Sequence, residues 1–165
     1  MLSQLFIKNI AVIESASIDF ENGFNVFTGE TGAGKSILID AINAVLGGRT
    51  SRDLVRTGAS KAFVSAVFSD ISPKVKNILD ELGYDSDEDD LLISREISSE
   101  GKNICKINAR PATVSALNSF HARLLTFTVS MTAQFCKTRN CTSVILTLTE
   151  THPQNFCHTL KAIKQ

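Results

Sequence analysis

The octet GETGAGKS at residues 29–36 constrains the fold of this chain more than any other stretch of its sequence. It satisfies the pattern G-x-x-x-x-G-K-[ST], in which glycines allow a backbone that turns successive N–H groups toward one point. The β-rich run FNVFT precedes the octet, and the stretch ILIDAINAVL, with apolar residues at helical spacing, follows it. A strand, a phosphate-binding loop and a helix in this order predict a nucleotide-binding α/β domain.

The octet predicts a binding site for nucleotide phosphate and Mg²⁺. A helix that begins near Lys35 adds unpaired N–H groups and the positive end of its dipole. Lys35 can reach the β- and γ-phosphates, and the Ser36 hydroxyl can ligate Mg²⁺. The predicted binding residues are Gly29, Glu30, Thr31, Gly32, Ala33, Gly34, Lys35 and Ser36, with Ser36 as the metal ligand.

The spacing of apolar residues predicts the elements around this loop, because alternation is typical of strands and a spacing of three and four is typical of helices. Gly47-Gly48 is expected to end the helix after the loop, Pro73 to open another helix and Thr113 to cap a third. Expected strands are 2–7, 15–20, 24–28, 61–68, 91–97 and 103–107, and expected helices are 35–46, 73–82 and 113–125. This order predicts a P-loop α/β fold with an antiparallel β flank.

The composition argues against a membrane protein and against bulk attraction to nucleic acid. Lysine plus arginine and aspartate plus glutamate both number 17, so the formal net charge is zero and no overall positive field results. The apolar runs are too short to span a bilayer, and the N-terminus lacks the pattern of a signal peptide. We therefore expect a cytoplasmic protein with no membrane partner. The cysteines and histidines lack zinc-ligand spacing, so no structural metal site is expected.

Around the octet the chain resembles the N-terminal head of the RecN family, DNA repair proteins in the SMC-like branch of the ABC ATPases. Further matching stretches are LFIKNIAVIESASIDFENGFNV before the octet, DLVRTG at 53–58, LLISREISSEGKN at 91–103 and INARP at 107–111. The resemblance covers residues 1–125 in order and implies an ABC/SMC-type half-head, the N-terminal part of an ATP-binding head. One departure is Ala109, where the family usually has the glycine of an Asn-Gly turn, so slight strain is expected in that hairpin.

The resemblance implies an ATP-dependent protein of double-strand break repair and recombination. In that family two heads sandwich ATP, so ATP, Mg²⁺, DNA and the second head of a homodimer are the implied cofactors and partners, and the nucleoid is the implied location. Lys35 and Ser36 carry over directly from the family's motif. Arg49, in the GGR run, is a weaker candidate for a phosphate or DNA contact. An exposed arginine that follows a helix end is the alternative interpretation.

The family pattern stops at Leu125. Its next landmark, N-I-H-G-Q-H-[DE], is replaced by TFTVSMT, and residues 126–165 contain no glycine, one acidic residue and nine threonines. Soluble domains rarely lose glycine and acidic residues together, because both serve turns and surfaces. Written as ACA TTC ACG GTC AGC ATG ACA and preceded by one restored A, the same bases encode N-I-H-G-Q-H-D. We therefore expect 126–165 to be an out-of-frame, irregular and poorly ordered tail on a truncated head. An unusual native tail is the alternative.

The sequence predicts ATP binding without independent hydrolysis. The full-length family is an ATPase, but this chain carries no acidic Walker B strand, ABC signature or switch histidine after the loop. Such groups polarise the γ-phosphate and position water, so no catalytic residue is assigned. One alternative is a self-contained small P-loop kinase or GTPase, for which Asp70 is the only tempting acid. A non-functional truncated remnant is the other.

Overall fold

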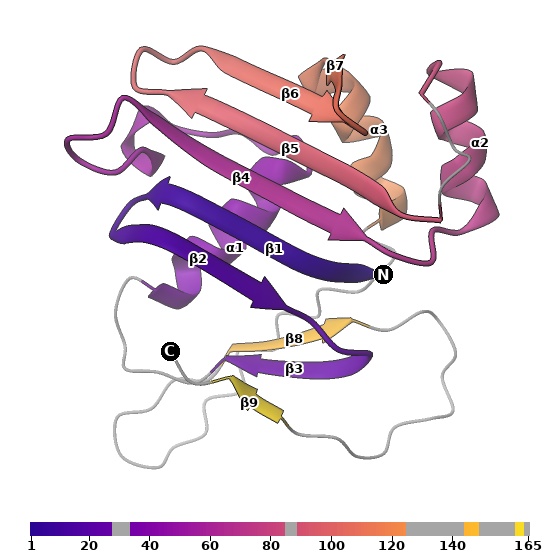
Figure 1. Cartoon of the computed structure of the whole chain (residues 1–165), viewed down its shortest axis with the longest axis horizontal. Helices are drawn as coiled ribbons and strands as arrows, with labels where there is room; N and C mark the ends of the chain where they lie inside the picture. The colour runs from indigo at the N-terminus through magenta and orange to yellow at the C-terminus, as the bar shows by residue number, and fades with distance from the viewer. Residues whose placement is uncertain (28–33, 85–88, 125–143, 149–160, 164–165) are drawn as a thin grey trace.

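The larger of the two sheets in the described structure is six-stranded and antiparallel (Figure 1). The computed structural model describes residues 1–27, 34–84, 89–124, 144–148 and 161–163. In this sheet the strand order is β2-β1-β4-β5-β6-β7, and every neighbouring pair is antiparallel. The strands are β1 (Leu2–Ile10), β2 (Ile13–Asp19), β4 (Lys61–Phe68), β5 (Leu91–Ser98), β6 (Asn103–Ile107) and β7 (Arg110–Ala112). The predicted antiparallel flank is therefore confirmed.

A second, three-stranded sheet is built on β3 (Gly23–Phe27), the strand that leads into the predicted phosphate loop. It pairs antiparallel with β8 (Val144–Leu148) and parallel with β9 (Lys161–Ile163), both of which lie in the tail. Residues 125–143, 149–160 and 164–165, which include most of the tail, lie outside the described residues. The irregularity expected of the tail as a whole therefore stays a prediction.

In the described ranges, three α-helices and one short 3₁₀ helix accompany the sheets. They are α1 (Gly34–Val45), η1 (Arg52–Leu54), α2 (Pro73–Glu81) and α3 (Val114–Leu124). In Figure 1, α1 runs behind β1 and β4, and α3 lies behind β5 and β6. None of the described helices has the length and apolar character that crossing a bilayer requires.

The alternation of side chains decides which face of the large sheet is covered. On β1, Leu5 and Ile7 are fully buried, whereas Gln4 and Lys8 are exposed. Helix α1 contacts β1, β4 and β5 on the buried face. Its own buried side chains recur at the spacing of three and four that the sequence showed: Ile37, Leu38, Ala41, Ile42, Ala44 and Val45. The sheet therefore fixes where the helix after the phosphate loop lies.

Helix α1 ends as predicted, at Gly47-Gly48. Gly47 has a φ of +90°, and the Gly48 N–H donates to the Asn43 carbonyl at 2.8 Å, which closes the last turn. A Cβ on Gly47 would lie 2.7 Å from Asn118 Oδ1 and 3.0 Å from Leu117 Cβ. Glycine at this position thus serves two purposes, since it takes the left-handed backbone and lets α3 approach closely.

The structure also corrects element ends. β1 reaches Ile10 and β2 starts at Ile13, so a tight turn replaces the longer connection that we predicted between 7 and 15. The strand β7 was not predicted. The predicted cap of α3 is confirmed, because the Thr113 hydroxyl accepts a hydrogen bond from the Ala116 N–H at 3.1 Å.

Candidate nucleotide-binding site

The strand–loop–helix order predicted from the octet is present. β3 ends at Phe27 and α1 begins at Gly34. Gly29, Glu30, Thr31, Gly32 and Ala33, predicted to cradle phosphate, lie outside the described residues. Gly34, Lys35 and Ser36 form the first turn of α1, and Ser36 is exposed. Ligand contacts by these eight residues therefore stay a prediction.

The amino-terminal end of α1 is suited to an anion. Its first turn contains no acidic residue, so no carboxylate of that turn offsets the positive end of the helix dipole. The first N–H groups of a helix have no partner within it and can donate to a phosphate. The exposed Ser36 hydroxyl in the same turn is a ligand that Mg²⁺ accepts. The described residues of this turn therefore fit a nucleotide phosphate with Mg²⁺.

The strand that leads into the loop is fixed by Asn25, which sequence analysis did not single out. Asn25 is 5% exposed. Its side-chain oxygen accepts from the Glu21 N–H at 3.1 Å, and its amide donates to the Glu21 carbonyl at 2.9 Å. Two residues away, the Phe27 ring packs edge-on against Phe20 with centroids 6.1 Å apart. A buried amide with both groups satisfied holds the entry to the loop in one register.

The opposite end of α1 is held by Arg95 of β5. Arg95 as a whole residue is 3% exposed. Nη1 donates to the Ala44 carbonyl at 2.8 Å and to the Gly48 carbonyl at 2.7 Å. Nη2 donates to Thr50 Oγ1 at 3.1 Å, and Nε donates to Asn103 Oδ1 at 3.1 Å. Burial lowers the pKa of Arg95, but an arginine side chain keeps its proton in proteins.

A sequence signal for Arg95 did exist. Alternation along β5 places it on the same face as Leu91, Ile93 and Ile97, all of which are buried. A charged residue at a position that the period assigns to the core marks a buried polar contact. The alternation along β5 does not predict which carbonyls accept from the guanidinium, because these carbonyls lie on α1 and on the segment after it.

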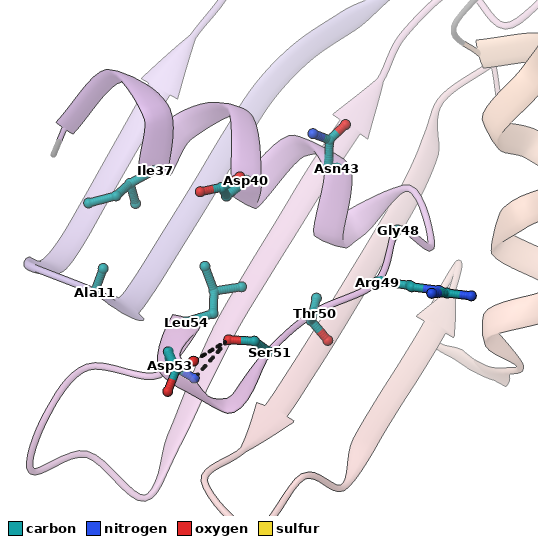
Figure 2. A pocket seen from close by; sticks show the side chains of 10 residues that line it. All are labelled: Ala11, Ile37, Asp40, Asn43, Gly48, Arg49, Thr50, Ser51, Asp53 and Leu54. Atoms are coloured by element: carbon teal, nitrogen blue, oxygen red, sulfur yellow. Dashed lines mark hydrogen bonds between the residues drawn. The ribbon is translucent and has the colours of Figure 1, made fainter.

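A pocket of about 560 Å³ lies beside α1 (Figure 2). Ile37, Asp40 and Asn43 line it from the helix, Ala11 lines it from the β1–β2 turn, and segment 48–54 closes it. In segment 48–54, the Ser51 hydroxyl is bonded to the Asp53 carboxylate and accepts from the Asp53 N–H, both at 3.0 Å. Polar groups and one apolar wall thus surround a space that runs along α1 from Ile37 to Asn43.

Arg49 belongs to the lining of this pocket, and its side chain is exposed. In Figure 2 it extends away from the Asp40 and Asp53 carboxylates. Within the described part of the chain, no hydrogen bond or ion pair engages its guanidinium. The Arg49 guanidinium is therefore available to a ligand.

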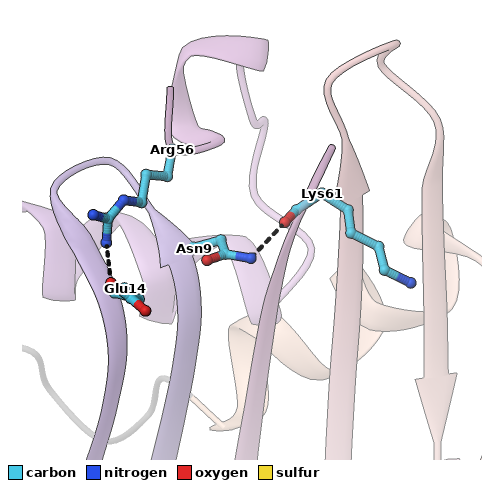
Figure 3. Close-up of polar contacts among 4 residues, drawn as sticks. All are labelled: Asn9, Glu14, Arg56 and Lys61. Carbon is cyan, nitrogen blue, oxygen red and sulfur yellow. Dashed lines mark hydrogen bonds and ion pairs between the residues drawn. The ribbon is translucent and has the colours of Figure 1, made fainter. Parts of the chain in front are cut away.

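The segment DLVRTG docks on the end of β1 (Figure 3). The Ala11 N–H donates to the Leu54 carbonyl and the Arg56 N–H donates to the Asn9 carbonyl, both at 2.9 Å. The Arg56 guanidinium reaches Glu14 of β2 at 3.2 Å, and the Asn9 amide donates to the Lys61 carbonyl at 3.3 Å. This segment therefore anchors the wall of the pocket to the large sheet.

Asp70, the acid that a self-contained kinase or GTPase would need, lies elsewhere. It is exposed, with a φ of +53°, in the turn after β4. β4 lies between β1 and β5 in the antiparallel sheet and does not pair with β3. An acidic residue that serves a P-loop site usually ends a strand beside the loop strand. This placement gives the kinase alternative no support.

A strand that leads into a glycine-rich loop, a helix after the loop and an antiparallel flank define the nucleotide-binding head of a P-loop ATPase. The AAA domain family model matches residues 4–140. Since that match spans more than half of the chain, the chain belongs to the AAA domain family.

RecN proteins are among the relatives that this chain resembles in sequence. The chain is 41% identical over 126 residues to the DNA repair protein RecN of Bacillus subtilis, a match that covers 76% of this chain and 22% of RecN. It is 35% identical over 125 residues to RecN of Deinococcus radiodurans, with 76% of this chain and 20% of that protein covered. The chain thus spans about 22% of the length of the Bacillus protein.

Solved SMC heads share the fold. An SMC ATPase studied for ATP-driven dimerization and DNA-stimulated activation superimposes with a TM-score of 0.61 at 28% identity, over 76% of this chain and 77% of that one. The Smc head of Pyrococcus furiosus, bound to the C-terminal domain of ScpA, gives 0.60 at 28% identity, over 76% and 32% of the two chains. RecF with ATP, at 19% identity and a TM-score of 0.54, shows the common fold alone; 68% of this chain and 27% of RecF are covered.

Proposed function

We propose that this chain binds ATP with Mg²⁺ at residues 29–36 as the N-terminal part of a RecN-like head. The observation that carries the proposal is the octet GETGAGKS, which follows β3 and whose last three residues open the acid-free first turn of α1. The backbone of the glycine-rich loop would cradle the phosphates, and Lys35 would neutralise them. Ser36 would ligate Mg²⁺, which would offset the negative charge of the phosphates.

The proposed biological role is double-strand break repair and recombination, with DNA and a second head as partners. It is supported by the names of the RecN relatives and by the dimerising SMC ATPase that shares the fold. Arg49 is the proposed contact to phosphate, of the nucleotide or of DNA, because its side chain is exposed and unengaged among the described residues. The proposed location is the cytoplasm, at the nucleoid.

Binding is proposed without turnover. ATP hydrolysis by a P-loop head needs groups that polarise the γ-phosphate and position water. No Walker B acid, signature or switch histidine follows the loop in these 165 residues. A polypeptide of these 165 residues is therefore expected to bind ATP without hydrolysing it.

Titration of the 165-residue chain with a fluorescent ATP analogue and Mg²⁺ tests this proposal. Lys35→Ala is expected to weaken binding at least about tenfold, because it removes a charge-assisted contact to phosphate. Lys74→Ala is the matched control, since Lys74 is exposed on α2. Phosphate release should not exceed that of buffer with ATP. Equal binding by wild type and Lys35→Ala would contradict the site, and Lys35-dependent turnover would contradict the absence of hydrolysis.

A further inference from the structure

Arg95 is the one charged side chain that is buried in the described part of the chain. No carboxylate pairs with it there. Burying a cation is costly unless hydrogen bonds replace its water. Here neutral acceptors replace the water, and the Ala44 and Gly48 carbonyls receive the two shortest bonds, at 2.8 and 2.7 Å. The hydrogen bonds of Arg95 to neutral acceptors, and not an ion pair, therefore account for its burial.

The Ala44 carbonyl belongs to the last turn of α1, and the Gly48 carbonyl lies in the segment that follows the helix. The last carbonyls of a helix lack partners within it, and they carry the negative end of its dipole. A guanidinium at this end complements that charge, just as a phosphate would complement the other end. A helix of 12 residues is about 18 Å long, roughly two Debye lengths in physiological salt. Direct attraction between Arg95 and a phosphate at the far end is thus small, and any effect on a ligand must act through position.

The contacts of Arg95 also bracket Arg49. Nη1 binds the carbonyl of Gly48 and Nη2 binds the hydroxyl of Thr50, so the residues before and after Arg49 are both tied to β5. The Arg49 side chain itself stays exposed. Gly48 and Thr50 line the pocket beside α1. One buried guanidinium thus fixes a helix end, a pocket wall and the backbone of an exposed arginine.

We propose that Arg95 is a positioning residue for the nucleotide site: it locks α1 and the Arg49 segment to β5 in the arrangement that binds ATP. This inference rests on the proposed ATP binding at residues 29–36. If the lock is lost, only part of the population holds the binding arrangement, and the apparent affinity falls by that fraction.

The test measures the affinity of the full chain for the fluorescent ATP analogue with Mg²⁺, at a temperature where circular dichroism shows each variant folded. Arg95→Met removes the bonds and is expected to weaken binding about tenfold. Arg95→Lys keeps the charge without the planar fork and should restore part of the affinity. Leu79→Ala is the control for lost stability. It opens a cavity at a fully buried position of α2, and should lower the Tm while leaving affinity unchanged.

Asn103→Ala keeps the test decisive if Arg95→Met does not fold. Asn103 lies on β6 and accepts from Arg95 Nε, and it is not part of the pocket lining. Its loss should weaken binding about threefold, whereas Asn103→Asp, which keeps an oxygen acceptor, should not.

A lowered Tm with unchanged affinity in Arg95→Met and Asn103→Ala would overturn the inference and leave ATP binding intact. Absence of ATP binding by wild type, or equal binding by Lys35→Ala, would overturn the proposed function, and this inference would fall with it.

Discussion

Ala109 occupies a turn whose backbone favours glycine. The turn joins β6 to β7, with Ile107 paired to Arg110, and its two central residues have φ of +45° (Asn108) and +64° (Ala109). Two positive φ values are typical of a type I′ hairpin turn. Asparagine tolerates this region, and Asn108 exchanges two 2.9 Å hydrogen bonds with the Leu92 backbone. Alanine has no such compensation, so the strain expected from the sequence is located at this Cβ.

Ala109→Gly is therefore expected to raise the free energy of unfolding by about 0.5–1 kcal/mol. Relief of the positive φ should outweigh the extra entropy that glycine gives the unfolded chain. Urea unfolding followed by circular dichroism measures the change. Ala112→Gly in β7 is the control, because it adds the same entropy without relieving strain and should lower stability. A less stable Ala109→Gly would show that the turn holds no strain.

At the scale of elements, local pattern predicted most of the fold and less of the site. The alternation of apolar residues identified the longer strands of the large sheet, and their spacing by three and four identified α1. Both patterns arise because each of these elements buries one face. Strand β7 was not predicted, because three residues are too few to show an alternation of apolar and polar side chains. The hydrogen bonds that Arg95 donates at the end of α1 were not predicted for a different reason. Its partners Ala44 and Gly48 are backbone carbonyls some fifty positions away, and no side-chain pattern encodes such a contact.

Besides Arg95, the close packing of Gly47 against α3 holds the carboxyl end of α1. Gly47→Ala is expected to lower the free energy of unfolding by about 2 kcal/mol, because the new methyl group meets Asn118 and Leu117 and the φ of +90° is unfavourable for alanine. Gly58→Ala is the matched control. Gly58 has a φ of +86° and nothing within 4 Å of the added Cβ, so only the backbone cost of about 1 kcal/mol remains. Thermal and urea unfolding compare the two variants. Equal losses would mean that the contact between α1 and α3 adapts freely to the methyl group.

At the scale of the whole molecule, the strand that leads into the phosphate loop has unusual neighbours. β3 pairs with β8 and β9, strands from the part of the chain that lacks the family pattern. The match to RecN of Bacillus subtilis covers 76% of the chain. The large sheet and α1 come from the family-like part, whereas the second sheet combines a family-like strand with two strands of the tail. The support of β3 therefore depends on whether the tail is native sequence.

The coding DNA decides that question. Restoring one base before codon 126 is expected to replace TFTVSMT by N-I-H-G-Q-H-D, and to return glycine and acidic residues to a stretch that has no glycine and one acid. Sequencing the gene from an independent culture measures this directly. A new read that contains the restored base would indicate a sequencing error. A new read that lacks this base but carries the codons predicted for 126–132 would indicate a lesion in the gene. Codons at 126–132 that no single-base change converts to the family motif would contradict the frame slip. The tail would then be native sequence. Selection would have acted on the contacts that the tail makes with the rest of the chain, so β8 and β9 would be genuine partners of β3.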